Sequence, residues 1–299
     1  MDMTKFRTLL AVIVLGAGTS VAAEPATFPT PQDAFEALTT AVDNRDAEAF
    51  EAIFGAENVD LLVSENDAEN AVNRLAFKTL VDEGFRFQRT EQGVILILGA
   101  EDWPFPVPIL RGPDGWHFDA EAGRQEIRDR EIGLNELAVI DLLLAYVDLQ
   151  TQFRQVDHDA DGVMEFAQTI ISSADERNGL FWPGGPGFVG QALARAELQG
   201  WSDGSEDFEP EPFLGYYFAI LHGQGPSAPG GNAEYLVGGN MVAGHAMLAV
   251  PADYDGTGIH SFLIGENGIL YEADLGEDTL AQAAEMDRYN PDDVWNVVE

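Results

Sequence analysis

The stretch Gly115–Gln150, "GWHFDAEAGRQEIRDREIGLNELAVIDLLLAYVDLQ", joins two sequence patterns and decides the fold. Its first residues, "GWHFD", have the alternation of a short strand. Apolar residues then recur at helical spacing from Ala120 to Val156, which predicts a long helix. We expect Gly133 to break or bend this helix, because glycine is a poor helix former. A sheet therefore ends where a long helix begins.

The residues before this stretch predict three helices followed by an antiparallel sheet. We expect helices to start at Thr30–Pro31 and near Asp46 and to cover Asp67–Glu83, because capping residues or apolar residues at helical spacing mark them. Four strand patterns follow, namely "FRFQRT", "GVILILG", "VPILR" and "GWHFD". This order of helices and strands resembles the cone-shaped NTF2-like fold.

The residues after the long helix predict a second antiparallel sheet. We expect "VMEFAQTIIS" to form a short helix and Ser173–Pro212 to be mostly loop. Strand patterns return in "LGYYFAILHG", "YLVGG", "GHAMLAV", "GIHSFLIG" and "ILYEAD", with a tight turn at Asn267–Gly268 between the last two. A final helix is expected over Asp278–Tyr289. A long helix, an irregular segment and an antiparallel sheet form the layout of pilin-like domains, so the sequence predicts an α+β fold.

The N-terminal residues have the pattern of a secretory signal. Basic Lys5 and Arg7 precede an apolar run, and the small residues of Val21–Ala23 follow it. We expect residues 1–23 to be a signal peptide that is cleaved before Glu24. The sequence therefore predicts a bacterial protein of the periplasm or the extracellular space.

Two domains are expected after the signal, at residues 24–130 and 131–299. The best later candidate for a membrane span, Leu137–Leu149, is interrupted by two aspartates and falls short of the roughly 18 apolar residues that a span needs. We therefore expect no membrane span after cleavage.

The composition excludes several classes of partner and chemistry. The chain has 15 Lys and Arg residues against 52 Asp and Glu residues, a formal charge of -37. Nucleic acid is not an expected partner, because phosphate contacts need Lys and Arg. The absence of cysteine excludes disulfides, thiol nucleophiles and thiolate metal sites. An envelope protein or a small ligand is the partner that we expect.

The segment "QVDHDADGVMEFAQ", Gln155–Gln168, has the spacing of a calcium loop at its start. The candidate ligands are the carboxylates of Asp157, Asp159 and Asp161, the backbone carbonyl of Val163 and, through water, Glu165. Gln168 occupies the position of the bidentate glutamate of a complete EF-hand, so calcium binding is expected to be weak. A solvated acidic turn and a catalytic acid cluster are the other interpretations of the same residues.

Aromatic residues beside proline and glycine form a second group of candidates. They are Trp103, Phe105, Trp182, Tyr216 and Tyr217. Such rings line ligand grooves, and they equally fill the edges of cores and domain interfaces. An aromatic cleft between the two domains is therefore our hypothesis for a ligand site, with packing as the alternative.

The histidines offer one further hypothesis. His245 and His260 lie on neighbouring predicted strands, where they could meet, and a zinc site there would need a third ligand such as His222. The alternative is that they are structural histidines of the sheet. No catalytic residue is predicted from the histidines or from any serine motif.

Several blocks of the sequence resemble one bacterial family. In chain order they are "EDWPFPVPILRGPDGWHFDAEAG", "IGLNELAVI", "DADGVMEFAQ", "NGLFWP", "GYYFAIL", "GQGPSAPGG", "AVPADYDGTG" and "YEADLGEDT". Together they resemble a family of secreted proteins of unknown function, DUF2950, from about Phe28 to Trp295. The resemblance implies no catalytic residue. Two positions depart from it: His245 replaces a usually apolar residue, and Asp255 stands where glycine is common.

These observations favour an exported, non-catalytic protein that acts by binding or assembly in the cell envelope, with calcium as a stabilising ligand. One difference from true pilins is clear, because about 110 residues separate the signal from the long helix. The alternative is a periplasmic hydrolase with a carboxylate-based site in an interdomain cleft. It would require two acids that converge with opposed pKa shifts.

Overall fold

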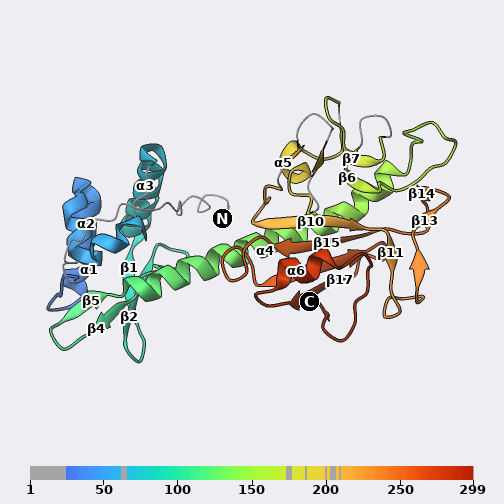
Figure 1. The fold of residues 1–299 in the computed structure, drawn as a ribbon. Coiled ribbons are helices and arrows are strands. Elements are labelled where there is room, and N and C mark those ends of the chain that lie inside the picture. The colour runs from blue at the N-terminus through green and yellow to red at the C-terminus, as the bar shows by residue number, and fades with distance from the viewer. Residues whose placement is uncertain are drawn as a thin grey trace. The chain divides into compact units, whose positions relative to one another are not determined.

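The computed structural model describes residues 25–61, 66–172, 177–185, 187–198, 201–202, 207–208 and 210–298 (Figure 1). The predicted signal peptide and its cleavage site lie outside these residues. The chain divides into two compact units, one that ends at Arg130 and one that starts at Glu131. Within the described ranges, no helix has the length and apolar character needed to cross a membrane.

The first unit begins with helices, as predicted. They are α1 (Pro31–Asn44), α2 (Ala47–Phe54), the 3-10 helix η2 (Ala56–Leu61) and α3 (Asp67–Glu83). The Thr30 hydroxyl accepts a hydrogen bond from the backbone N–H of Asp33, and the Asp46 carboxylate accepts one from Ala49. These side chains satisfy backbone donors that have no partner within the first turn of a helix.

The sheet of the first unit has antiparallel pairing throughout. Its strands are β1 (Phe85–Arg89), β2 (Gly93–Leu98), β3 (Trp103–Pro104), β4 (Ile109–Arg111) and β5 (Trp116–Phe118). The order is β1-β2-β4-β5, with β3 paired to β2. A Cβ atom on Gly93 would lie 2.2 Å from the Ile109 carbonyl oxygen, so the close approach of β2 and β4 requires glycine there. The core beneath the sheet includes Phe35, Leu38, Phe54, Leu96, Leu98 and Phe118.

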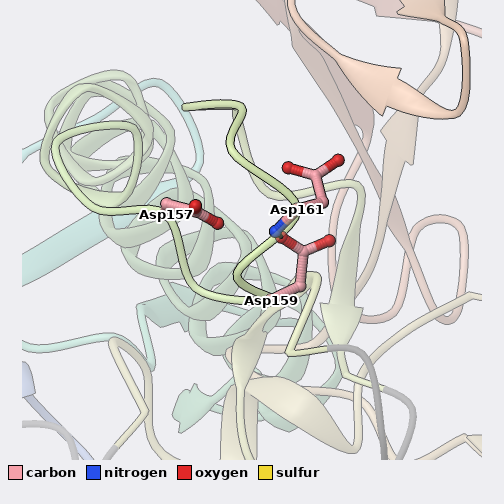
Figure 2. A group of neighbouring side chains, drawn as sticks. All are labelled: Asp157, Asp159 and Asp161. Atoms are coloured by element: carbon pink, nitrogen blue, oxygen red, sulfur yellow. Dashed lines mark hydrogen bonds between the residues drawn. The ribbon is translucent and has the colours of Figure 1, made fainter.

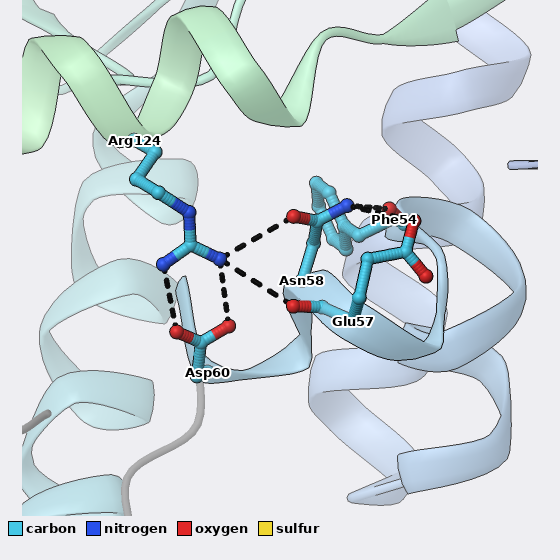
Figure 3. Close-up of polar contacts among 5 residues, drawn as sticks. All are labelled: Phe54, Glu57, Asn58, Asp60 and Arg124. Atoms are coloured by element: carbon cyan, nitrogen blue, oxygen red, sulfur yellow. Dashed lines mark hydrogen bonds and ion pairs between the residues drawn. The ribbon is translucent and has the colours of Figure 1, made fainter. Parts of the chain in front are cut away.

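A polar cluster attaches η2 to the long helix α4 (Ala120–Phe153) (Figure 3). Arg124 donates to both carboxylate oxygens of Asp60, at 2.7 and 2.9 Å, and to the Asn58 side-chain oxygen at 3.3 Å. Asn58 in turn donates to the Phe54 carbonyl at 2.9 Å. The hydrogen bonds from the guanidinium lower the pKa of Asp60.

Helix α4 is continuous, and the boundary between the two units falls within it. Of the predicted break or bend at Gly133, the break is therefore wrong. An interior glycine costs a helix only about 1 kcal/mol relative to alanine, and the buried neighbours Ile132, Val139 and Leu143 offset that cost.

The second unit contains the predicted second antiparallel sheet. Its strands, in spatial order, are β10 (Tyr216–Leu221), β15 (Ala246–Pro251), β16 (His260–Gly265), β17 (Leu270–Asp274) and β18 (Asn296–Val297). Every residue of β15 is buried, because both faces of the sheet are covered. Figure 1 shows the sheet between α4 and the short helix α6 (Thr279–Ala284). Met247 and Phe262 pack with residues of α4, whereas Leu248 and Leu263 pack in another cluster with Ala283 of α6. The predicted turn at Asn267–Gly268 is confirmed.

Short elements complete the described part of this unit. They are β6 (Thr169–Ile171), β7 (Gly179–Phe181), α5 (Gln191–Ala194), β8 (Trp201–Ser202), β9 (Asp207–Phe208), β11 (Gly223–Gln224), β12 (Ala233–Glu234), β13 (Leu236–Val237) and β14 (Asn240–Met241). Strands β6 and β7 are parallel.

Two predicted helices differ in the structure. The segment "VMEFAQTIIS" is extended, because the buried Gln150 side chain hydrogen bonds to both the N–H and the carbonyl of Ala167, at 2.8 and 3.0 Å. The last helix ends at Ala284, short of the predicted Tyr289. Tyr289 instead forms backbone hydrogen bonds with Gly223 and Gly225, like a residue in a strand.

Candidate functional site

A cavity of about 450 Å³ lies within the first unit, where α1, α2, α3 and the β3 region meet. Its apolar wall includes Leu38, Phe50, Phe77, Leu80, Trp103 and Phe105. Its charged side chains are Arg45, Asp67 and Arg74. The cavity therefore combines a largely apolar interior with a small number of charged groups.

Helix geometry brings the α3 residues of the cavity to one face. Asp67, Ala71, Arg74 and Phe77 recur at intervals of three and four residues, which places them on one side of a helix. Two apolar residues of α3, Val72 and Leu75, are 56% and 67% exposed and do not belong to its buried side. The less exposed side of α3, which includes Phe77 and Leu80, is the side that lines the cavity. Lys78 of α3 forms an ion pair with Asp43 of α1, which links the two helices.

The aromatic side of the cavity is a group of rings in mutual contact. The Phe105 ring lies 6.3 Å from the Trp103 ring and 6.0 Å from the Phe77 ring, both in edge-on contact. The Arg130 guanidinium lies 5.5 Å from the centre of the Trp103 ring. Cation–π contact and edge-on packing hold the rings in fixed orientations.

Two of the five predicted aromatic ligand residues, Trp103 and Phe105, line this cavity, and the other three belong to the second unit. Tyr216 is fully buried and donates a hydrogen bond to the His260 carbonyl at 2.8 Å, so it is a core residue. Tyr217 is only partly buried and packs on the opposite face of β10.

Trp182, the remaining predicted aromatic residue, is also held by its neighbours. Its indole N–H donates to the Gly179 carbonyl at 2.8 Å, and its ring lies 5.2 Å from His158. The Arg177 guanidinium lies 5.3 Å from the ring. Packing within the second unit therefore explains the position of Trp182 without a ligand.

The acidic loop follows α4 in the second unit. One carboxylate oxygen from each of Asp157, Asp159 and Asp161 lies within 4.8 Å of the others (Figure 2). The structure thus brings together the three aspartates that the sequence singled out. Their spacing is short enough for one cation to contact all three.

The carboxylates of this loop also accept hydrogen bonds from its backbone. Asp157 accepts from Ala160 and Gly162 at 2.8 and 2.9 Å. Desolvation raises the pKa of Asp157, but these hydrogen bonds outweigh it and the net shift is downward. Asp161 accepts from the Val163 N–H at 2.7 Å. The loop is therefore ordered by its own turn chemistry, as Asp-rich turns are.

Glu165, which was predicted to reach the ion through water, is not grouped with the three aspartates among the described residues. Its side chain is buried and accepts hydrogen bonds from the Met241 N–H at 2.7 Å and from the Gln168 amide at 2.8 Å. The glutamate is thus committed to attaching the loop to β14.

The predicted meeting of His245 and His260 is wrong. His245 precedes Ala246, which pairs with Gly265 at the last position of β16, whereas His260 is the first residue of β16. The two histidines therefore lie toward opposite ends of the strand pair. His222 binds the Gln168 carbonyl at 2.7 Å instead of a histidine neighbour.

His245 is a buried imidazole with no hydrogen-bond partner for either ring nitrogen in the described structure. Its ring packs edge-on to Phe166 at 4.7 Å and to Tyr146 at 5.2 Å. Burial, with a smaller contribution from Arg154, lowers its pKa to about 4. The ring is neutral at pH 7 and behaves as an apolar core side chain.

Two glutamates have raised pKa values, as a general acid would. Burial raises the pKa of Glu197 to about 7, against hydrogen bonds from the Ile170 and Ile171 backbone. Burial also raises the pKa of Glu131. No charged group contributes to either shift, so neither glutamate is one of two closely coupled acids.

The cavity arginines are the residues that sequence reasoning missed. Arg45 lies just past α1 and Arg74 lies inside α3, so no local motif connects them. The sequence did contain a signal for Arg74, because it lies at helical spacing from the apolar Phe77 in a chain with few basic residues.

The chain matches the family described as "Protein of unknown function (DUF2950)" over residues 25–298. No curated protein and no solved structure matches it. The NTF2-like and pilin-like resemblances of the two halves therefore stay predictions, while the α+β architecture is shown. Because the match covers nearly the whole chain, the protein belongs to the DUF2950 family.

Proposed function

We propose that this protein is an exported, non-catalytic binding protein of the bacterial cell envelope and that the first-unit cavity is its ligand site. The cavity carries the proposal, because its volume of about 450 Å³ is that of small-molecule sites, which span about 300–1,000 Å³. Its apolar wall with a few charged groups is also typical of such sites. Trp103 and Phe105 supply the aromatic part of the wall.

The hydrolase alternative has less support. A carboxylate-based mechanism needs two acids whose environments push their pKa values apart. Glu131 and Glu197 owe their raised pKa values to burial and not to a neighbouring acid. The aspartates of the acidic loop are close together, but Asp159 and Asp161 are exposed, so the loop lacks the two distinct environments that such a pair of acids needs.

Export and calcium binding belong to the same proposal. The basic, apolar and small residues at the N-terminus support export, and N-terminal sequencing of protein from whole cells is expected to start at Glu24. Recovery of the intact N-terminus from the cytosol would contradict export. Calcium would act as a weak structural ligand of Asp157, Asp159 and Asp161.

A cavity-filling substitution tests the ligand site. Ala71 lies on α3, lines the cavity and is exposed, so Ala71→Phe adds a ring to the cavity without entering the core. The matched control is Ala68→Phe, which adds the same ring to the same helix at an exposed position outside the cavity wall.

Binding is measured with N-phenyl-1-naphthylamine, a neutral apolar dye whose fluorescence rises in apolar sites. We expect wild type and Ala68→Phe to bind the dye with equal affinity and Ala71→Phe to bind it at least about tenfold more weakly. If Ala71→Phe binds as tightly as wild type, the cavity is not the ligand site.

A further inference from the structure

We propose that the cavity selects an amphipathic organic anion, with an apolar chain against the aromatic wall and a carboxylate-type head group beside Arg45 and Arg74. This inference rests on the proposed function and adds the chemical class of the ligand. It comes from the charges of the cavity compared with those of the chain as a whole.

The charge balance of the cavity is the reverse of that of the chain. Its wall contains two arginines, Arg45 and Arg74, and one acid, Asp67. The whole chain has 15 basic against 52 acidic residues. A protein with this composition surrounds most surface features with carboxylates, which repel anions. The cavity is thus a place where an anionic group meets a local excess of positive charge.

In the described structure, the two guanidinium groups are available to a ligand. In the described part of the chain, neither Arg45 nor Arg74 forms an ion pair with a carboxylate, whereas Arg86, Arg124 and Arg288 each do. Arg74 is half-buried, and the attraction between a guanidinium and an anion is stronger in the lower effective dielectric of a partly buried site. Its planar donors also match the two oxygens of a carboxylate.

The depth of the wall residues orients the ligand. Arg45 is exposed and occupies the end of α1, where its backbone has a positive φ of 55°. Leu38 and Phe105, by contrast, are only 1% and 5% exposed. A head group therefore contacts the arginines near the opening, and the apolar chain extends toward Leu38 and Phe105.

Three ligands with one alkyl chain and different head groups test this class. They are decanoate, decanol and decyltrimethylammonium, which carry a negative, a neutral and a positive head. Isothermal titration calorimetry gives their affinities, below the concentrations at which they form micelles. We expect decanoate to bind about tenfold more tightly than decanol, because a charge-assisted hydrogen bond replaces solvation of the head. Decyltrimethylammonium is expected to bind most weakly.

Substitutions of the arginines locate the selectivity. In the double variant Arg45→Gln with Arg74→Gln, decanoate and decanol are expected to bind within about twofold of each other. Arg74→Lys retains the charge and is expected to keep the preference for decanoate. The control Arg89→Gln removes one exposed charge from β1 of the same unit, outside the cavity wall, and is expected to leave the preference unchanged.

Each outcome points to a different conclusion. Equal binding of decanoate and decanol to wild type, or a preference that survives the double substitution, would overturn the anion class. In that case a loss of dye binding in Ala71→Phe would still support the cavity as a site. If Ala71→Phe retains both the dye and decanoate, the proposed function and this inference fail together.

Discussion

The two units place their polar groups differently. In the first unit, pairs such as Arg124 with Asp60 lie at the surface, with side chains that are 40% and 54% exposed. The second unit also has exposed ion pairs, such as Arg288 with Glu234, but in addition it has polar groups inside its core. The buried polar side chains of the described residues are Gln150, Glu165, Ser172, His245, Ser261 and Thr279, and all of them belong to the second unit.

This difference has an energetic meaning. An exposed ion pair contributes about 0–1 kcal/mol, because water solvates both charges when the pair is broken. A buried polar group that loses its hydrogen-bond partner destabilises the folded state by its full desolvation free energy, about 1–3 kcal/mol for each group. The first unit is therefore expected to respond chiefly to ligands of its cavity, and the second to pH and to single polar substitutions.

The largest effect is expected at Gln150. Its fully buried side chain bonds the Ala167 N–H, the Ala167 carbonyl and the Tyr146 hydroxyl. Gln150→Leu leaves these groups without that partner and should lower the free energy of unfolding by about 3–5 kcal/mol. Urea denaturation measures the change.

Two variants show whether burial is the cause. Gln155→Leu removes an exposed amide just past the same helix and should cost less than about 0.5 kcal/mol. Arg124→Gln breaks the bidentate pair with Asp60 in the first unit and should cost about 1 kcal/mol or less. If Arg124→Gln costs as much as Gln150→Leu, the comparison between the units is wrong.

The second-largest effect is a pH dependence with two opposing parts. The unfolded His245 imidazole takes up its proton near pH 6.5 but the folded one near pH 4, so its contribution to stability is lost as pH falls through this range. The folded Glu197 carboxyl keeps its proton to about pH 7 but the unfolded one only to about pH 4.5, so stability falls as pH rises between these values. In wild type the two slopes largely cancel between pH 4.5 and 6.5.

Single substitutions separate the two slopes. The difference in unfolding free energy between Glu197→Gln and wild type should grow, in favour of the variant, by about 2–4 kcal/mol from pH 4.5 to pH 7. The difference between His245→Leu and wild type should grow in favour of the variant as pH falls from 6.5 to 4, by a similar amount. Urea titrations at these pH values measure both. Differences that do not change with pH would mean that neither group titrates abnormally.

The sequence predicted best what neighbouring residues determine. The helix starts predicted at Thr30 and near Asp46 depend on contacts within one turn of helix, and the structure confirms them. The three aspartates of the acidic loop are likewise neighbours in the chain, and the structure brings them together. In each case the signal and the geometry are both local.

Long-range contacts explain what the sequence did not predict. The extended conformation near Ala167 depends on Gln150, which lies 17 residues earlier. The cavity depends on three helices and a strand, so Arg45 and Arg74 share no motif. Trp103 and Phe105 were predicted as ligand residues of a cleft between the domains. The sequence did not predict a cavity within the first unit. Their position in the cavity follows from packing within the first unit.

Calcium is expected to have the next largest effect. The Glu165 carboxylate is hydrogen bonded to Met241, and Gln168 stands where a complete calcium loop has a bidentate acid. The dissociation constant for calcium should therefore lie in the weak range of about 10⁻⁴–10⁻³ M. Calcium at about 10 mM would then stabilise the protein by roughly 1.4–2.7 kcal/mol. Thermal unfolding with calcium or magnesium measures it, and magnesium should do less because it resists dehydration.

A double substitution separates binding from screening of the acidic surface. Asp159→Asn with Asp161→Asn should abolish the difference between calcium and magnesium while keeping the response common to both. An equal gain from calcium in wild type and in the double variant would show that the loop is a solvated turn. In that case only the polar groups inside the core of the second unit would contribute to its stability.

The smallest effect is expected at Asp255, a polar residue of the second unit that is constrained by its backbone. Its φ of 59° lies in the left-handed region, which glycine adopts without a steric cost. Asp255→Gly removes the steric cost of this conformation but adds freedom to the unfolded chain, so a net gain of about 0.5 kcal/mol is expected. Asp253→Gly is the matched control, because Asp253 has no positive φ and its substitution should lower stability by up to about 1 kcal/mol. Urea denaturation of both variants measures the contrast. If Asp255→Gly destabilises the protein as much as Asp253→Gly does, the aspartate side chain and not the backbone conformation determines the energetics of this turn.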